Sequence, residues 1–154
     1  MAKNKELQGL GGWLVVVGFN VVTTPLFLVA EVYPLFVAIF SEGGLTTVPP
    51  PGSKSSHPFW KPLLFTEVGV ISAFVLASFY LAILFFSKNK QFPQLYVGFL
   101  VLVAVFSLAN SLVVHAIDPT SSIFNQSVTG PFLQTLIWGS YMAASERVKV
   151  TFVQ

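Results

Sequence analysis

The stretch that decides the fold is QFPQLYVGFLVLVAVFSLANSLVV, residues 91–114, which runs for 24 positions without Asp, Glu, Lys, Arg or His. A helix that crosses the hydrocarbon core of a bilayer needs about 20 predominantly apolar residues. Residues 12–30 and 68–86 are equally free of charge over 19 positions each, and residues 119–145 over 27, although the first third of the last window is polar. The sequence therefore predicts four transmembrane helices, at about 10–31, 63–86, 94–117 and 128–147.

The composition leads to the same class of protein. The chain has 154 residues, of which 54% are hydrophobic and only 9% are charged. A soluble domain carries about 25% charged residues, because its surface must stay hydrated. Soluble enzymes, disordered tails and nucleic-acid binders are therefore excluded. We expect an all-α integral membrane protein, with residues 1–154 forming a single membrane domain whose first partner is the lipid bilayer.

The connections between these helices are short, except for an expected external loop at residues 41–61. This loop contains Pro49-Pro50-Pro51, which favours polyproline II structure and cannot be helical. Pro34 lies at the end of the first apolar stretch, and we expect the chain to leave the first helix there or to begin a short interfacial piece at residues 35–40. The first stretch is longer than the roughly 7–15 apolar residues of a signal peptide, so we expect it to stay in the protein.

Positively charged residues predict the orientation, since Lys and Arg accumulate on the cytoplasmic side. With four helices both termini lie on one side. That side receives six basic residues, and the other side receives Lys54 and Lys61 only. The prediction is an antiparallel bundle with both termini inside the cell, in the cytoplasmic (inner) membrane. The six residues are Lys3, Lys5, Lys88, Lys90, Arg147 and Lys149.

Four residues are candidates for anchors at the membrane interface. Trp13 and Trp60 stand at the beginnings of two helices, as in the aromatic belts of membrane proteins. Arg147 and Lys149 follow the fourth helix, where they can meet anionic head groups. Apolar and polar residues alternate from Arg147 to Phe152, which favours a short strand or a tail that lies along the interface.

Ionisable residues inside the membrane are the default functional candidates, because each costs about 2.5–3.5 kcal/mol at the bilayer centre. Glu31 lies 21 residues beyond Leu10, or about 31 Å along a helix, near the external end. Glu67, His115 and Asp118 are expected at the same depth. We predict that Glu31, Glu67 and His115 line one water-accessible cavity, with Asp118 beside it. The alternative is that Glu67 pairs with Lys61 and Glu31 points into the head groups.

Polar residues spaced as i, i+3, i+4 and i+7 share a helix face, and such faces should meet inside the bundle because lipid offers no hydrogen-bond partner. Each of the four helices has one such face. The faces are Asn20, Thr24, Phe27 and Glu31; Glu67, Ile71, Phe74 and Ser78; Ser107, Ser111, His115 and Asp118; and Gln134, Trp138, Tyr141 and Ser145.

No motif for catalysis or for a cofactor is present. Ser111, His115 and Asp118 have the residue types of a hydrolase triad, but their spacing on one helix fits poorly the contact between a nucleophile and its base. Two His residues with scattered acids give little support for a metal site, and the absence of Cys excludes thiolate ligands. We therefore expect a protein that is not an enzyme and has no catalytic, cofactor or metal site.

Both ends of the chain resemble a known family. The opening segment Gly9-Leu10-Gly11-Gly12-Trp13-Leu14 and the closing segment from Ile137-Trp138 to Phe152 resemble those of the YdgK-like bacterial inner-membrane proteins, domain-of-unknown-function family 2569. The resemblance implies four spans in a bacterial cytoplasmic membrane and no functional residue. From the residues alone, the glycines at positions 9, 11 and 12 would let another backbone approach the first helix.

Two classes of function remain open. The first is a non-enzymatic membrane protein that binds another membrane protein, a second copy of itself, a lipid or a membrane-active toxin. The second is a small transporter or channel component in which Glu31, Glu67, His115 and Asp118 form an acidic site for a cation or a proton near the external face. Small size and short loops favour the first, and the shared depth of the acids favours the second.

Overall fold

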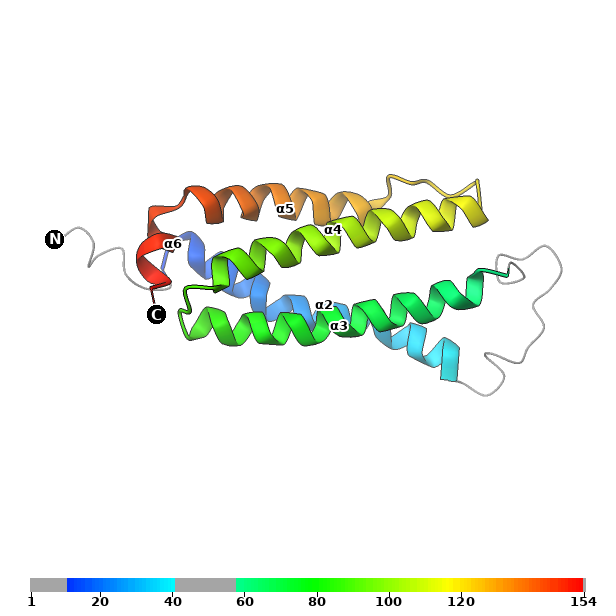
Figure 1. Ribbon diagram of the computed structural model, residues 1–154, viewed down its shortest axis with the longest axis horizontal. Coiled ribbons are helices and arrows are strands. Elements are labelled where there is room, and N and C mark those ends of the chain that lie inside the picture. The colour runs from blue at the N-terminus through cyan, green and yellow to red at the C-terminus, as the bar shows by residue number, and fades with distance from the viewer. Residues whose placement is uncertain (1–10, 41–57, 154) are drawn as a thin grey trace.

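The computed structural model describes residues 11–40 and 58–153, and every regular element within these ranges is a helix. Residues 1–10, which include Gly9, and most of the expected external loop lie outside the described residues. Figure 1 shows the elements in their order along the chain. They are α2 (Trp13–Phe40), α3 (Trp60–Phe86), α4 (Phe92–Ile117), α5 (Gln126–Ala144) and the short α6 (Glu146–Thr151).

Three of these helices are long and apolar enough to cross a membrane. They are Trp13–Val37 within α2, the whole of α3 and the whole of α4, with mean hydropathies of 2.0, 2.4 and 2.5. At 1.5 Å per residue each spans about 38–40 Å, more than the hydrocarbon core requires. The fourth long helix, α5, is shorter, with 19 residues, and less apolar. The structure therefore indicates a multi-pass membrane protein built entirely of helices in its described part.

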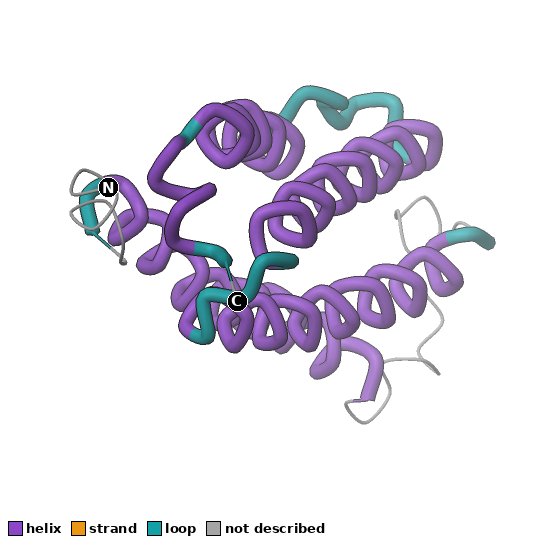
Figure 2. Tube along the Cα trace, turned by 60° about the vertical axis from the view of Figure 1, so that its left-hand side comes forward, coloured by secondary structure: helices purple, strands orange, loops and turns teal. Residues whose placement is uncertain are grey.

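The long helices pack as two antiparallel pairs. α2 lies along α3 and α4 lies along α5, while α3 and α4 make fewer contacts with each other. The pairs are close together at the end that carries α6 and separate toward the opposite end, as Figures 1 and 2 show.

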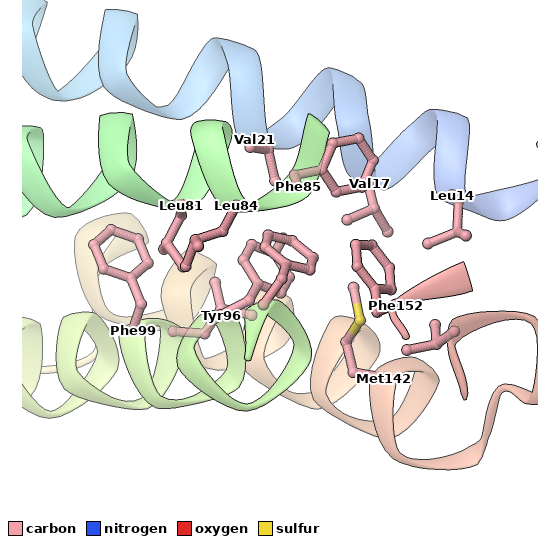
Figure 3. Packing of buried hydrophobic residues seen from close by; sticks show 13 residues of the cluster. Leu14, Val17, Val21, Leu81, Leu84, Phe85, Tyr96, Phe99, Met142 and Phe152 are labelled. Carbon is pink, nitrogen blue, oxygen red and sulfur yellow. The ribbon is translucent and has the colours of Figure 1, made fainter. Parts of the chain in front are cut away.

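The main hydrophobic core occupies the end where the two pairs meet. α2 contributes Leu14, Val17 and Val21, and α3 contributes Leu81, Leu84 and Phe85 (Figure 3). The core is completed from the other pair and from the end of the chain by Phe92, Tyr96, Phe99, Leu100, Met142, Val148 and Phe152. All five helices thus meet in this one cluster, which joins the two pairs.

α2 continues past Pro34 to Phe40, so the expected end of the first helix near Pro34 was wrong. A proline inside a helix removes one backbone hydrogen bond, which helices in membranes tolerate. The packing explains why the helix goes on. Val32 and Ile39 of α2 lie on either side of Pro34 and pack with Val68 and Ile71 of α3 in a second, smaller core.

The C-terminal segment is a helix, so the expected strand was wrong. The backbone N–H of Val148 donates to the hydroxyl of Ser145 at 3.4 Å, which caps α6 at its start. Val148 and Phe152 are spaced as i and i+4, so they fall on one helical face as well as on one face of a strand. Both are buried, and the ring of Phe152 stacks on that of Phe92 with centroids 4.9 Å apart.

Gly11 and Gly12 make room for a side chain of α6. A Cβ atom at Gly11 would lie 3.1 Å from Nη1 of Arg147, and one at Gly12 would lie 3.8 Å from its Nε. Gly12 also has φ +60°, a conformation that glycine adopts without strain. Among the described residues, these two glycines therefore accommodate the Arg147 guanidinium. From the sequence we expected them to allow the close approach of another backbone.

An acidic cavity between the helix pairs

A cavity of about 330 Å³ lies between the two helix pairs and is called the acidic cavity below. Glu31 comes from α2, Glu67 from α3, and Asn110 from α4, while Pro131 closes it from α5. The remaining polar residues of its lining are Ser107, Ser111, Asn125 and Ser127. The cavity therefore gathers carboxylates, amides and hydroxyls from α2, α3, α4 and the start of α5 in a bundle that is otherwise mostly apolar.

Glu67 is held by a hydrogen bond across the two pairs. Nδ2 of Asn110 donates to Oε1 of Glu67 at 3.1 Å. The carboxylate fixes the orientation of the amide, because a carboxylate accepts hydrogen bonds and only the NH₂ group of Asn110 can donate. This leaves Oδ1 of Asn110 buried and without a hydrogen-bond partner. A buried acceptor without a partner is uncommon in folded proteins.

Sequence reasoning missed Asn110. The signal was available, since Asn110 is a strongly polar side chain within the 24-residue charge-free window, three positions after Ser107. Residues three apart share a helix face, so Asn110 belongs with the face of Ser107 and Ser111. What the sequence could not supply was its partner, because Glu67 lies 43 positions away on another helix.

Glu31 stands where the acidic cavity meets a second one. Its side chain is exposed, whereas that of Glu67 is partly buried, and the two charges interact. The second space has a volume of about 260 Å³ and is called the Tyr96 cavity below. Leu28, Glu31, Val103 and Pro131 line both spaces. A ligand bound at Glu31 could therefore extend from the acidic cavity into the Tyr96 cavity.

The Tyr96 cavity is polar on one side through a small hydrogen-bond network. The hydroxyl of Tyr96 on α4 donates to Oδ1 of Asn20 on α2 at 3.1 Å. The hydroxyl of Thr24 donates to the backbone carbonyl of Asn20 at 2.7 Å. Gln134 of α5 and Ser78 of α3 complete the polar lining. This network uses the side-chain oxygen of Asn20 and ties the two helix pairs together.

The polar helix faces expected from the sequence meet at these two cavities. The face of Asn20, Thr24, Phe27 and Glu31 lines the Tyr96 cavity along its full length. The face of α3 is divided, with Glu67, Ile71 and Phe74 in the acidic cavity and Ser78 in the Tyr96 cavity. The other two expected faces reach the cavities only in part, through Ser107 and Ser111 on α4 and Gln134 on α5.

The structure brings Glu31 and Glu67 to one cavity, whereas His115 lies in the last turn of α4 and Asp118 directly follows that helix. Nδ1 of His115 lies 2.7 Å from the backbone carbonyl oxygen of Ser121. A carbonyl only accepts, so Nδ1 carries the proton in this contact. Oδ1 of Asp118 accepts from the hydroxyl of Thr120 at 2.6 Å. Neither His115 nor Asp118 is among the residues that line the acidic cavity.

The four expected interface anchors lie at the ends of helices. Trp13 opens α2 and Trp60 opens α3. Because the two helices are antiparallel, these indoles are at opposite ends of the pair. Arg147 is partly buried against Gly11 and Gly12, while Lys149 is exposed on α6. Arg147 thus has a packing role in addition to the predicted role at the interface.

Among the described residues no group of three or more His, Cys, Asp or Glu side chains is placed to hold a metal ion. The two carboxylates of the acidic cavity are accompanied by amides and hydroxyls, which are weak ligands for transition metals but good acceptors of hydrogen bonds. The arrangement is suited to binding a cationic group or a proton.

Comparison with known proteins identifies a family. A family model described as a protein of unknown function, DUF2569, matches residues 7–153. No curated protein and no solved structure matches the chain. The match covers both terminal motifs on which the resemblance was based, so the expectation about the family is confirmed. The chain belongs to the DUF2569 family of proteins of unknown function.

Proposed function

We propose that this is a non-enzymatic protein of the bacterial cytoplasmic membrane, with four spans and both termini inside, that binds a cation in the acidic cavity. As the fourth span, α5 has no charged residue and would reach about 28 Å, close to the thickness of the hydrocarbon core. The orientation rests on the basic residues at the end of the bundle that carries α6. Among the described residues these are Lys88, Lys90, Arg147 and Lys149.

The observation that carries the proposal is the presence of Glu31 and Glu67, from two helices, at one cavity. Carboxylates in a membrane bundle are costly and occur where they line the pathway of an ion or a proton. No Lys, Arg or His is among the described residues that line either cavity. The two negative charges are therefore not neutralised within the lining, and the site attracts a cation or takes up a proton.

This geometry favours a small transporter or a channel component. Glu31 is exposed and can receive a cation first, while Glu67 is deeper and is held by Asn110. The Tyr96 cavity continues from Glu31 toward the main core. A bound cation has two adjoining positions, as a pathway through a bundle requires.

The test is thermal unfolding of the detergent-solubilised protein in the presence of the chlorides of sodium, potassium, magnesium and methylammonium. A ligand at 100 times its Kd stabilises the folded state by about 2.7 kcal/mol, which is a shift of several degrees. We expect at least one of the four cations to raise the Tm of the native chain. Glu67→Gln should abolish that increase, since it removes the charge and keeps the shape.

Glu146 provides the matched control, because it is an exposed carboxylate on α6 outside both cavities. Glu146→Gln should keep the cation-dependent increase in Tm. If none of the four cations raises the Tm of the native chain, the proposal is wrong. It is also wrong if the increase is the same in Glu67→Gln and in Glu31→Gln as in the native chain.

Binding to a membrane protein, a lipid or a toxin remains the other proposal for this chain. It is supported by small size and by the many apolar side chains on the outside of the helices, such as Phe19, Leu26 and Leu76. Lipid alone accounts for such a surface, so the cavity is the more specific observation. A partner that copurifies in a fixed ratio, and is lost on substitution of surface residues but not of Glu67, would favour this second function.

A further inference from the structure

The size of the acidic cavity bears on what kind of cation it holds. Its volume of about 330 Å³ is roughly ten times the 30 Å³ that a water molecule occupies in the liquid. A bare metal ion needs several oxygen ligands that converge at about 2.0–2.6 Å. The cavity is large enough for an organic molecule and falls in the lower range of small-molecule sites, about 300–1,000 Å³.

The walls beside the carboxylates are aromatic. Phe74 of α3 lies between two rings of α4, with its centroid 5.7 Å from that of Phe99 and 5.8 Å from that of Phe106, both edge to face. Phe74 and Phe106 line the acidic cavity, and Phe99 lines the Tyr96 cavity. The three rings form a continuous apolar wall along both spaces. Such a wall can contact the apolar body of a ligand and the positive charge at its head.

The amide of Asn110 adds a requirement for a hydrogen-bond donor. Its Nδ2 is used by Glu67, and its Oδ1 is buried and has no partner. A buried acceptor gains from a ligand that carries an N–H group. A protonated amine meets both needs, because its charge pairs with Glu67 and it carries the N–H donors that the amide oxygen lacks.

The charges of the lining argue against zwitterions. An amino acid or an aminolipid head group brings an anionic carboxylate or phosphate next to its ammonium group. Among the described residues that line the two cavities there is no Lys, Arg or His to receive that anion. Two carboxylates would repel it. A ligand with a single positive charge is favoured.

We propose that the ligand of the acidic cavity is a monocationic amine with an apolar body. Its ammonium group binds between Glu31, Glu67 and Asn110, and its body lies on the wall of Phe74, Phe99 and Phe106 toward the Tyr96 cavity. This inference rests on the proposed cation site and names the class of its ligand.

Four probes separate the contributions of charge and body. Phenethylamine is protonated at pH 7 and has an aromatic body, methylamine has the charge without the body, phenylalanine adds a carboxylate to the phenethylamine skeleton, and potassium is a bare cation. Binding to the full chain is measured by calorimetry in a neutral maltoside detergent, which contains no ammonium lipid. We expect phenethylamine to bind at least tenfold more tightly than each of the other three.

Variants then assign the contacts. Glu67→Gln should weaken phenethylamine binding at least tenfold, and Asn110→Leu should weaken it at least threefold. Phe74→Leu should reduce the ratio of phenethylamine to methylamine affinity while the affinity for methylamine stays the same. Glu146→Gln should change none of these values. Far-UV circular dichroism and the elution volume on gel filtration show that each variant is folded.

The outcomes distinguish this inference from the proposed function. If potassium or methylamine binds in a Glu67-dependent manner and phenethylamine binds no better, the cation site stands and the amine with an apolar body is refuted. If phenethylamine binds the Glu67→Gln variant as tightly as the native chain, it binds as an apolar solute, and the inference is refuted as well. If no probe binds in a manner that depends on Glu67 or Glu31, both proposals fail.

Discussion

Gly18 in α2 offers a sharp test of how the α2–α3 pair is packed. A Cβ atom built on Gly18 would lie 2.9 Å from Cε1 and 3.1 Å from Cζ of Phe85. Such a contact forces a neighbour to move. The Phe85 ring is 1% exposed and is surrounded by Phe92 at 5.1 Å and Phe152 at 5.8 Å between centroids. The ring has no free space to move into, so Gly18→Ala should strain the main core.

The expected change in the free energy of unfolding for Gly18→Ala combines two opposing contributions. Replacing Gly by Ala inside a helix gains about 1 kcal/mol, because alanine has the higher helix propensity. Overpacking a tight core costs about 1–3 kcal/mol. Gly98 in α4 is a matched control, since a Cβ there meets nothing within 4 Å. We expect Gly98→Ala to be stabilising by up to about 1 kcal/mol, and Gly18→Ala to be less stable than Gly98→Ala by about 1–3 kcal/mol.

The assay is titration of the maltoside-solubilised protein with sodium dodecyl sulfate, with loss of helix followed by circular dichroism. Phe85→Leu in the Gly18→Ala background should recover part of the loss, because the smaller side chain leaves space for the new methyl group. A coupling energy of about 0.5–3 kcal/mol is typical of residues in contact. Equal stability of Gly18→Ala and Gly98→Ala, or the absence of coupling to Phe85, would refute the packing described here.

Three further predictions concern the ends of the bundle. A cysteine in place of Lys54, in this Cys-free chain, should be labelled by an impermeant maleimide in intact cells; labelling only after the membrane is opened would reverse the topology. The double variant Arg147→Glu and Lys149→Glu should lower the amount of protein in the membrane, since each basic residue near an anionic surface contributes about 1 kcal/mol; unchanged abundance and topology would contradict this. Phe152→Ala should lower the free energy of unfolding by about 3 kcal/mol and expose the α6 end to protease, whereas the same change at the exposed Val153 should do neither.

Hydropathy predicted most of the helices because the cost of exposing a backbone in lipid leaves few alternatives to a helix. The prediction of a span at 94–117 agrees with α4 within two residues at each end. The first helix, predicted at about 10–31, extends further in the structure, to Phe40. The prediction ended it too early because Pro34 suggests the end of a helix. A proline inside a membrane helix is tolerated, and here Ile39 beyond it continues the contact with α3.

The C-terminal segment could not be predicted from its pattern. Over six residues the alternation of apolar and polar side chains fits a strand and a helix equally well, because Val148 and Phe152 share a face in both. What decides for the helix is the cap from Ser145 and the place for Phe152 between Phe85 and Phe92. The cap is local, three residues long, whereas the place of Phe152 depends on contacts that are distant in the sequence.

The candidate site was predicted in part by depth. Counting residues along the helices placed Glu31 and Glu67 at one level, and both line the same cavity. The depth of a residue along a helix does not show toward which neighbour its side chain points, and a loop beside the helix can provide the contact instead. His115 is at a similar depth, but its Nδ1 contacts the carbonyl of Ser121 in the connection that follows α4.

The place of α6 has a consequence for the biogenesis of the protein. α6 follows α5 in the chain, so it leaves the ribosome after every helix that it contacts has been made, at a rate of about 5–20 residues per second. Until then the ends of α2 and α4 lack Val148 and Phe152, and the rings of Phe85 and Phe92 have no cover. The two helix pairs can therefore insert first as separate hairpins, and the main core that joins them is completed only after α6 has left the ribosome.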